Sequence, residues 1–166
     1  MQDSIKKVRD YLKPFGIDDK IMELPVSSAT VALAAQAVGT EPARIAKTLA
    51  FDIDGTSLLI VCAGDTKIDN AKYKARFHAK AKMLPPDEVP DRIGHAVGGV
   101  CPFAVKKEVS IFLDISLTRF PVVYPACGSA NSAIALTPEE IFRLSGASEW
   151  VDVCKLKDET HIPQIL

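Results

Sequence analysis

Residues 48–64, TLAFDIDGTSLLIVCAG, constrain the fold more than any other segment. Two apolar runs, 48–53 and 57–64, flank an Asp-Gly pair. Asp-Gly is a strong signal for a two-residue hairpin turn, because that turn needs a positive φ at both central residues. We therefore predict an antiparallel hairpin with Asp54-Gly55 as its turn, and the remaining elements must be arranged around it.

The same residues match a catalytic motif. Asp52-Ile-Asp54-Gly-Thr56 resembles the DxDGT motif of haloacid-dehalogenase-type phosphatases, in which the first aspartate attacks phosphorus. That aspartate must sit where a strand ends and a loop opens, whereas here an apolar strand resumes directly after Gly55. The acidic stretch 64–69 also follows too closely for crossover connections, which need a dozen or more residues each. The sequence therefore favours a hairpin over a phosphatase.

Periodicity and capping residues predict helices and further strands. Glycine after an amphipathic or alanine-rich run ends a helix, and Thr before such a run begins one. These signals predict helices over 5–15, 30–38, 69–78 and 137–144, and a short helix that starts at Thr40 and runs towards Lys47. We predict extended segments over 21–24, 81–84, 109–115, 120–126, 132–136 and 150–154, and a loose tail over 156–166. The expected fold class is α+β or mixed α/β, in a single domain over 1–166.

Composition restricts the classes of function. The 166 residues include 20 Lys and Arg against 21 Asp and Glu, so no overall field attracts polyanions or anionic lipid. No segment approaches the roughly 20 apolar residues of a membrane span, and the first residues do not resemble a signal peptide. The four cysteines lack the spacing of a zinc site and indicate reduced thiols. We expect a cytoplasmic protein with no metal, no cofactor, and no membrane or DNA partner.

Two loops of small residues are candidates for a binding site. Residues 95–105, HAVGGVCPFAV, contain two consecutive glycines, which let a ligand approach the backbone closely. The N–H groups of such a loop can form an oxyanion-binding concavity, although tight turns use the same residues. Residues 126–136, ACGSANSAIAL, either leave room for a ligand or form an ordinary hairpin loop.

Lys47 is the candidate cationic group. It lies where the predicted short helix gives way to the first strand of the hairpin. A lysine there can neutralise the carboxyl end of the helix. Its neighbours Ala46 and Leu49 also suggest a packed junction, from which an ammonium could point into a cleft. The local residues leave both interpretations open.

Four separated segments carry a family resemblance. They are PARIAKTLAF, GGVCPF, IFLD and ACGSANSAIALTPEEIFRLSGA. In their order and spacing they resemble the YbaK family, the prolyl-tRNA-synthetase-associated free-standing aminoacyl-tRNA deacylases, over about residues 25–155. The resemblance implies a mixed sheet that curls towards a barrel, with helices packed around it. It also implies hydrolysis of the ester between a wrong amino acid and the terminal adenosine of a tRNA, often tRNA for proline.

The resemblance further implies a set of site residues. Lys47 would hold the 3′ end of the substrate, and the N–H groups around Gly98 and Gly99 would stabilise the tetrahedral oxyanion. The implied substrate-binding residues are Thr30, Val100, Cys101, Pro102, Phe103, Asp114, Gly128, Ser129 and Asn131. Some proline-editing relatives carry a histidine just after the later glycine, where this chain has Ala130 and Asn131. The amino-acid specificity therefore stays open.

The implied chemistry needs neither metal nor protein nucleophile, because an aminoacyl ester is already activated. A positioned water and oxyanion donors suffice, and by resemblance the ribose hydroxyl beside the ester assists the water. Cys101 has no histidine partner apparent from sequence, so we interpret it as a neutral thiol. Selection of the amino acid is partly steric, which favours a small side chain such as that of alanine, serine or cysteine.

Residues 67–82 form a basic segment in which Asp69 is the only acid. Lys72 and Arg76 share a helix face, and such a face can follow a phosphate backbone with salt-sensitive affinity. A solvated helix surface is the equal alternative. The expected partners are the 3′ acceptor end of aminoacyl-tRNA and either prolyl-tRNA synthetase or an elongation factor. The alternative function is a non-catalytic module that binds tRNA or a synthetase through the same fold.

Overall fold

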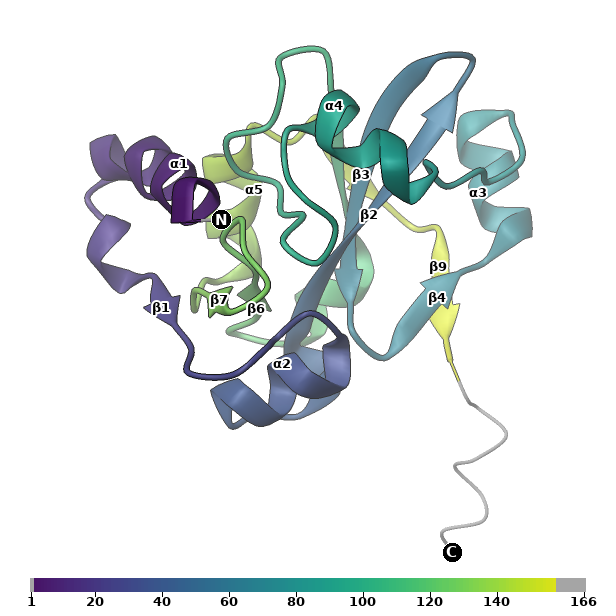
Figure 1. The fold of residues 1–166 in the computed structure, drawn as a ribbon. Helices are drawn as coiled ribbons and strands as arrows, with labels where there is room; N and C mark the ends of the chain where they lie inside the picture. Colours follow the sequence, from purple (N-terminus) through teal and green to yellow (C-terminus); the bar gives the residue numbers. More distant parts are fainter. Residues whose placement is uncertain (1, 158–166) are drawn as a thin grey trace, which may run out of the picture.

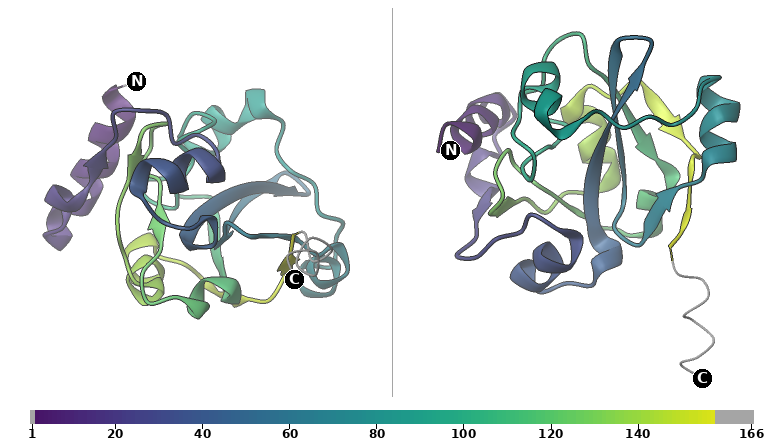
Figure 2. Two further views of the ribbon diagram at one scale, coloured as in Figure 1. Left: turned by 90° about the horizontal axis from the view of Figure 1, so that it is seen from below. Right: turned by 45° about the vertical axis from the view of Figure 1, so that its right-hand side comes forward.

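A five-stranded mixed sheet forms the centre of the computed structural model, which describes residues 2–157 (Figure 1). The strand order is β6-β2-β3-β5-β8. The strands are β2 (Ile45–Ile53), β3 (Thr56–Ala63), β5 (Ser110–Asp114), β6 (Tyr124–Pro125) and β8 (Glu149–Val151). Figure 2 shows the long strand β2 bending across the molecule, so that the sheet curls. The predicted fold class, a curled mixed sheet with helices around it, is confirmed.

The hairpin predicted from the Asp-Gly pair is confirmed. β2 and β3 pair antiparallel from Ala46 opposite Ala63 to Ile53 opposite Thr56. Asp54 and Gly55 form the turn with φ of 50° and 86°, both in the left-handed region that this turn requires. β6 joins β2 in parallel on one side, while β5 and then β8 extend the sheet in parallel beyond β3.

Helices pack against both faces of the sheet. They are α1 (Gln2–Leu12), α2 (Val31–Val38), α3 (Asn70–Phe77), α4 (Val89–Ile93) and α5 (Pro138–Ser145). Short 3-10 turns are η1 (Lys13–Phe15), η2 (Asp18–Lys20), η3 (Pro42–Arg44), η4 (Pro86–Glu88) and η5 (Ile115–Arg119). Within residues 2–157, none of the helices is long and apolar enough to cross a bilayer.

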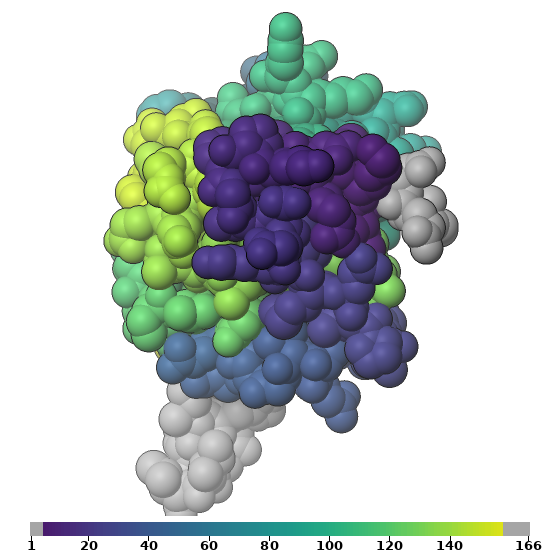
Figure 3. Space-filling model, turned by 90° about the vertical axis from the view of Figure 1, so that its left-hand side faces the viewer, coloured from purple at the N-terminus to yellow at the C-terminus, as the bar shows by residue number. Residues whose placement is uncertain are grey.

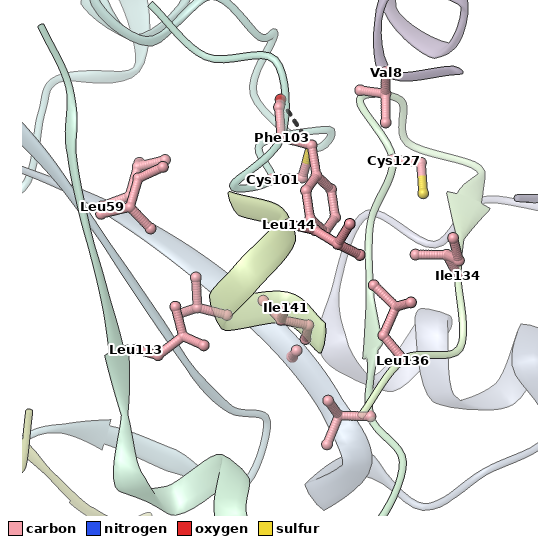
Figure 4. Close-up of a cluster of buried hydrophobic side chains, with 14 of the residues drawn as sticks. Val8, Leu59, Cys101, Phe103, Leu113, Cys127, Ile134, Leu136, Ile141 and Leu144 are labelled. Carbon is pink, nitrogen blue, oxygen red and sulfur yellow. Dashed lines mark hydrogen bonds between the residues drawn. The ribbon is translucent and has the colours of Figure 1, made fainter. Parts of the chain in front are cut away.

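Two main hydrophobic clusters hold these layers together, and a third, of Ala34, Ala35 and Ile45, lies between α2 and β2. The larger contains side chains of β3, β5, α1, α4 and α5, and Figure 4 shows Leu59, Leu113 and Leu144 among its members, with Leu144 next to Phe103. The smaller lies under α3, where Tyr73 packs among residues of β2 and β3. In Figure 3, α1 and the residues that follow it cover one side of the molecule. The Tyr11 hydroxyl ties α1 to α5 by donating to the Leu144 carbonyl at 2.5 Å.

Two pairs of short strands lie outside the main sheet. β1 (Met22–Glu23) pairs with β7 (Ser132–Ala133), and β4 (Thr66–Ile68) pairs with β9 (Cys154–Leu156). The predicted extended segments 21–24, 109–115, 120–126 and 132–136 therefore exist, although several are shorter than predicted. β4 and α4 were not predicted. The predicted tail begins inside β9 at Leu156, and residues 158–166 lie outside the described part of the chain.

Three local predictions were wrong, each because a contact from elsewhere in the chain decides the structure. The short helix after Thr40 is only the turn η3, and strand β2 already begins at Ile45, where it pairs with β6. Residues 81–84 make a single bridge to β2 and no strand. Residues 150–154 are split between β8 and β9, because the Val153 N–H donates to the Asp114 carboxylate at 2.8 Å and draws the chain out of the main sheet.

Asp52 lies inside strand β2, where its carboxylate accepts a hydrogen bond from Arg92 at 2.6 Å. This hydrogen bond lowers the pKa of Asp52 below its ordinary range. The resulting stability is present above the unfolded pKa of about 3.9 and is lost as pH falls through the folded value. We expect Asp52→Asn to lower the free energy of unfolding at pH 7, and the difference from wild type to shrink at pH 3.

Urea unfolding at both pH values measures this difference. Asp54→Asn is the matched control, because asparagine also adopts the left-handed conformation of that turn position. If Asp52→Asn lowers the free energy of unfolding as much at pH 3 as at pH 7, the stabilisation does not come from the charged Asp52 carboxylate.

Candidate functional site

A cavity of about 350 Å³ lies along the outer edge of β2. β6 pairs with this edge only at Ile45 and Ala46, and residues 82–84 pair with it only near Ala50 and Asp52. Within the described residues, no strand covers the edge between these two points. The N-terminal turn of α2 and two groups of residues from later loops complete the cavity walls; these groups are Val97, Gly98 and Val100, and Ala126, Ser132 and Ala133. The site is therefore a gap in the sheet that other segments enclose.

Polar groups of β2 face this gap. Ala50 accepts a hydrogen bond on its outer side from Leu84, and Asp52 donates one there to Lys82. Because the direction of backbone groups alternates along a strand, the N–H and C=O of Thr48 point towards the same edge, into the cavity. A ligand with its own donor and acceptor could complete the edge at this point.

Two hydroxyl groups in the cavity wall are buried without a partner. Ser28 Oγ and Thr48 Oγ1 both belong to lining residues, and neither finds a hydrogen-bond partner within the described chain. Leaving a buried hydroxyl unpaired costs about 1–3 kcal/mol. These hydroxyls were not predicted from sequence, because nothing in the local pattern shows whether a hydroxyl will find a partner. They are candidate contacts for a ligand.

Lys47 lines the cavity from the middle of β2, opposite Cys62 of β3. Its side chain is half-buried, and the amine donates a hydrogen bond to the Thr66 carbonyl at the start of β4. Burial lowers the pKa of Lys47, and the nearby charge of Lys157 lowers that pKa further. In the described part of the chain no carboxylate forms a salt bridge with it. An ammonium has three N–H donors, and the Thr66 carbonyl accepts from only one of them.

The two small-residue loops meet at the cavity. A Cβ on Gly99 would lie 2.5 Å from the carbonyl oxygen of Gly128, so the two backbones touch where neither residue carries a side chain. Gly98 lines the cavity with a φ of 96°. The Gly99 N–H donates to the Ala96 carbonyl at 3.0 Å, which closes a turn. Among the described groups, the N–H donors of Gly98 and Val100 have no partner, and both residues line the cavity.

Residues 101–103 do not line the cavity. Cys101 and Phe103 are fully buried in the larger hydrophobic cluster, and Pro102 is buried beside them. Figure 4 shows the Cys101 thiol turned towards the Phe103 carbonyl. Burial raises the pKa of Cys101 to about 12, so the thiol is neutral at physiological pH. The contribution of this segment to the site is to fix the loop that carries Gly98 and Val100.

His95 is a neighbour of Cys101 that the sequence analysis missed. Its Nε2 lies 3.5 Å from the Cys101 sulfur and 2.7 Å from the Phe103 carbonyl, to which it donates. Burial lowers the pKa of His95, which favours the neutral ring. The separation of only six residues in one loop was the signal available. A neutral thiol beside a neutral imidazole is a buried packing pair and not an activated nucleophile.

Other predicted site residues have structural contacts. Asp114 is 1% exposed and accepts hydrogen bonds from the N–H groups of Ser116 and Val153, at 2.9 and 2.8 Å. Ser129 donates to the Asn131 side chain at 2.8 Å. Neither of these two nor Asp114 lines the cavity, although Ser132 and Ala133 beside them do. Thr30 does line it, and its hydroxyl caps α2 by accepting from the Leu33 N–H at 3.2 Å.

Lys72 and Arg76 share one face of α3, as predicted, but that face binds carboxylates of the protein itself. Lys72 pairs with Asp152 at 3.0 Å and Arg76 with Glu149 at 2.5 Å. Arg76 also lies over the Phe112 ring. Neither residue lines the cavity. For metal binding, the described residues contain no group of three His, Cys, Asp or Glu side chains placed to hold an ion.

The fold and the site define a small α/β domain with a largely apolar cavity that includes a partly desolvated lysine in its lining. A family model for the aminoacyl-tRNA editing domain matches residues 26–144. The chain belongs to this family, and the YbaK-like resemblance predicted from sequence is confirmed.

Three similar proteins place the chain within the family. Protein YwhH of Bacillus subtilis, which is uncharacterised, is 48% identical over 153 residues, covering 92% of this chain and 98% of its own. EbsC of Enterococcus faecalis, named as a candidate Cys-tRNA(Pro)/Cys-tRNA(Cys) deacylase, is 28% identical. The match covers 67% of this chain and 69% of EbsC. A solved structure described as a candidate trans-editing enzyme for prolyl tRNA synthetase is 31% identical with a TM-score of 0.82. The match covers 92% of this chain and 97% of the solved one.

The contact between the glycine loops gives a specific prediction. In Gly99→Ala the new methyl group would collide with the backbone at Gly128 and Ser129, so one of the two loops must move. Overpacking of this kind typically costs about 1–3 kcal/mol. We expect a lower unfolding midpoint in urea together with a changed cavity. Gly39→Ala is the control, since a methyl group there has open space and only the strain of a φ of 87°. Equal stability of Gly99→Ala and wild type would show that the loops do not depend on their contact.

Proposed function

We propose that this protein is a trans-editing aminoacyl-tRNA deacylase that hydrolyses the ester of a mischarged tRNA, with a small amino acid on tRNA for proline or a similar tRNA. The observation that carries the proposal is the cavity itself. Three residues that line it support the proposal: Lys47, whose ammonium is partly desolvated, and Gly98 and Val100, whose N–H groups have no partner among the described residues. These are the groups that an ester with a polyanionic leaving group requires.

The proposed chemistry is attack of water on the ester carbonyl carbon. The carbonyl oxygen becomes an oxyanion, and the N–H groups of Gly98 and Val100 donate to it. One oxyanion donor is typically worth about 10²–10³ in rate. Collapse of the tetrahedral intermediate breaks the bond between the acyl carbon and the ribose oxygen, which releases the amino acid and restores the ribose hydroxyl. The neighbouring ribose hydroxyl assists the water, so the protein supplies no nucleophile.

Gly99 has a different role in this proposal from the one implied by the resemblance. Its N–H already closes the turn to Ala96, so it is not available to an oxyanion. What Gly99 supplies is the absence of a side chain, which lets the loop 97–100 lie against Gly128. The donors then fall to the residues on either side of it.

The cavity walls favour a small acyl group. Alanines from four separate segments contribute to them, namely Ala29, Ala34, Ala46, Ala50, Ala126 and Ala133. In an apolar pocket, one methylene group discriminates by about 10–200-fold. The unpaired hydroxyls of Ser28 and Thr48 would meet the polar atoms of the aminoacyl group. We propose alanine, serine or cysteine as the edited amino acid, with prolyl-tRNA synthetase or an elongation factor as a partner in the cytoplasm.

The experiment is a deacylation assay on a panel of tRNAs for proline charged with alanine, serine, cysteine or proline. We expect hydrolysis of at least one small mischarged amino acid and little hydrolysis of the prolyl ester. Absence of hydrolysis of every small aminoacyl-tRNA would overturn the proposal. Salt-sensitive tRNA binding without turnover would support the non-catalytic module instead.

Lys47→Met separates a functional lysine from a structural one. Methionine keeps an unbranched apolar side chain as far as Cε and removes the amine, with the charge that burial disfavours. We expect kcat/KM to fall about 10–100-fold, as expected for loss of a hydrogen bond from a charged group worth about 1.5–3 kcal/mol. The thermal midpoint should equal or exceed that of wild type. A variant that keeps full activity, or one that loses activity only because it unfolds, would argue against a role for Lys47 in binding the substrate.

A further inference from the structure

A ribbon of exposed lysines lies beside the candidate site. In the two-stranded sheet of β4 and β9, Lys67 stands directly opposite Lys155. Lys157 follows immediately after β9 ends. All three side chains are exposed. We call Lys67, Lys155 and Lys157 the lysine ribbon. Figure 1 shows β4 and β9 lying side by side, next to α3.

The charge of the lysine ribbon is not neutralised within the described residues, where none of its three amines forms a salt bridge. Like charges directly opposite each other on paired strands destabilise a sheet. This arrangement therefore opposes folding slightly, unless a bound anion offsets it.

The neighbouring acids in the described part of the chain are already engaged. Asp65 binds Arg119 at 2.6 Å and Asp152 binds Lys72 at 3.0 Å. Asp69 lies near enough to Lys155 for that charge to contribute to lowering its pKa. Its carboxylate, however, accepts from the first N–H groups of α3, at 3.0 and 3.1 Å. Within residues 2–157, the surface around β4 and β9 thus keeps an excess of positive charge, although the chain as a whole has a net charge of −1.

The lysine ribbon is continuous with the candidate site. The first residue of β4, Thr66, is the one whose carbonyl accepts the hydrogen bond from the Lys47 amine. Lys157 lies close enough to Lys47 for its charge to contribute to lowering the pKa of Lys47. A line of positive charge therefore runs from the exposed strands to the cavity wall. An anionic chain that ends at Lys47 would lie along it.

We propose that the lysine ribbon binds the phosphate backbone of the nucleic acid whose 3′ end enters the cavity. This proposal rests on the proposed function and adds the surface that holds the strand leading to the ester. It assigns the backbone contact to Lys67, Lys155 and Lys157, because Lys72 and Arg76 already pair with carboxylates. The contacts are to phosphate and carry no information about base sequence.

The test compares two triple variants of the full chain. Lys67→Gln, Lys155→Gln and Lys157→Gln remove the lysine ribbon. Lys13→Gln, Lys106→Gln and Lys107→Gln remove the same number of exposed charges elsewhere and serve as the matched control. The measurement is binding of uncharged tRNA for proline by fluorescence anisotropy between 50 and 200 mM salt. Each phosphate contact contributes about 0.7–0.9 to the slope of log K against log salt.

We expect the ribbon variant to lose about two to three units of this slope, and the control variant to lose less than one. In deacylation assays the ribbon variant should show a raised KM with kcat unchanged at saturating tRNA. On aminoacyl-adenosine, which has no phosphate backbone, it should equal wild type. Its thermal midpoint should not fall, because the substitutions remove a repulsion. If the triple variant does not fold, Lys157→Gln alone, outside the strands, should remove about one unit of slope.

An unchanged salt slope in the ribbon variant would overturn the proposal, even if hydrolysis persists. Competition by poly-glutamate of equal charge as effective as that of tRNA would overturn the assignment to nucleic acid. If no aminoacyl-tRNA is hydrolysed but the slope still falls in the ribbon variant, the proposed function fails and the phosphate-binding surface stands. The two proposals are therefore tested separately.

Discussion

The incomplete pairing of β2 is the constraint on which the site depends. One edge of this strand is fully paired with β3, while the other is covered only near its two ends, by β6 and by residues 82–84. A sheet edge left open inside a protein presents N–H and C=O groups that need partners. Here the segments on either side enclose the gap and exclude a further strand, so the outward N–H and C=O groups of Thr48 face the cavity. The rest of the fold holds that gap open.

The sequence predicted the parts of the fold that local chemistry decides. The Asp-Gly turn, the Thr30 cap of α2 and the capping box at Thr137 depend on residues within a few positions of one another, and the structure has all three. The start of β2 could not be predicted in this way, because Ile45 becomes strand through pairing with residues almost 80 positions later. The break between β8 and β9 likewise depends on Asp114, about 40 residues earlier.

The site was predicted less completely than the fold, for a related physical reason. The contact between Gly99 and Gly128 joins two loops that are far apart in sequence, and only the family resemblance suggested that they meet. Burial of Cys101 and Phe103 follows from how the whole cluster packs, so their motif could not show that they turn away from the cavity. The ion pairs of Lys72 and Arg76 are also long-range. A cation in a sequence shows a charge but not whether the fold already neutralises it.

Near-neutral overall charge fits the proposed function, in which the protein must release its product. Strong attraction to the whole tRNA would retain charged and uncharged forms alike, since both have the same backbone. If contact is confined to three exposed lysines, the phosphate contacts contribute only modestly to the affinity for tRNA, and this contribution falls as salt rises. Discrimination then depends on the enclosed cavity, where burial strengthens each polar contact with the acyl group. The two proposals separate these tasks in the same way: the half-buried Lys47 at the cavity wall would bind the ester end, and the exposed lysine ribbon would hold only the chain that carries it.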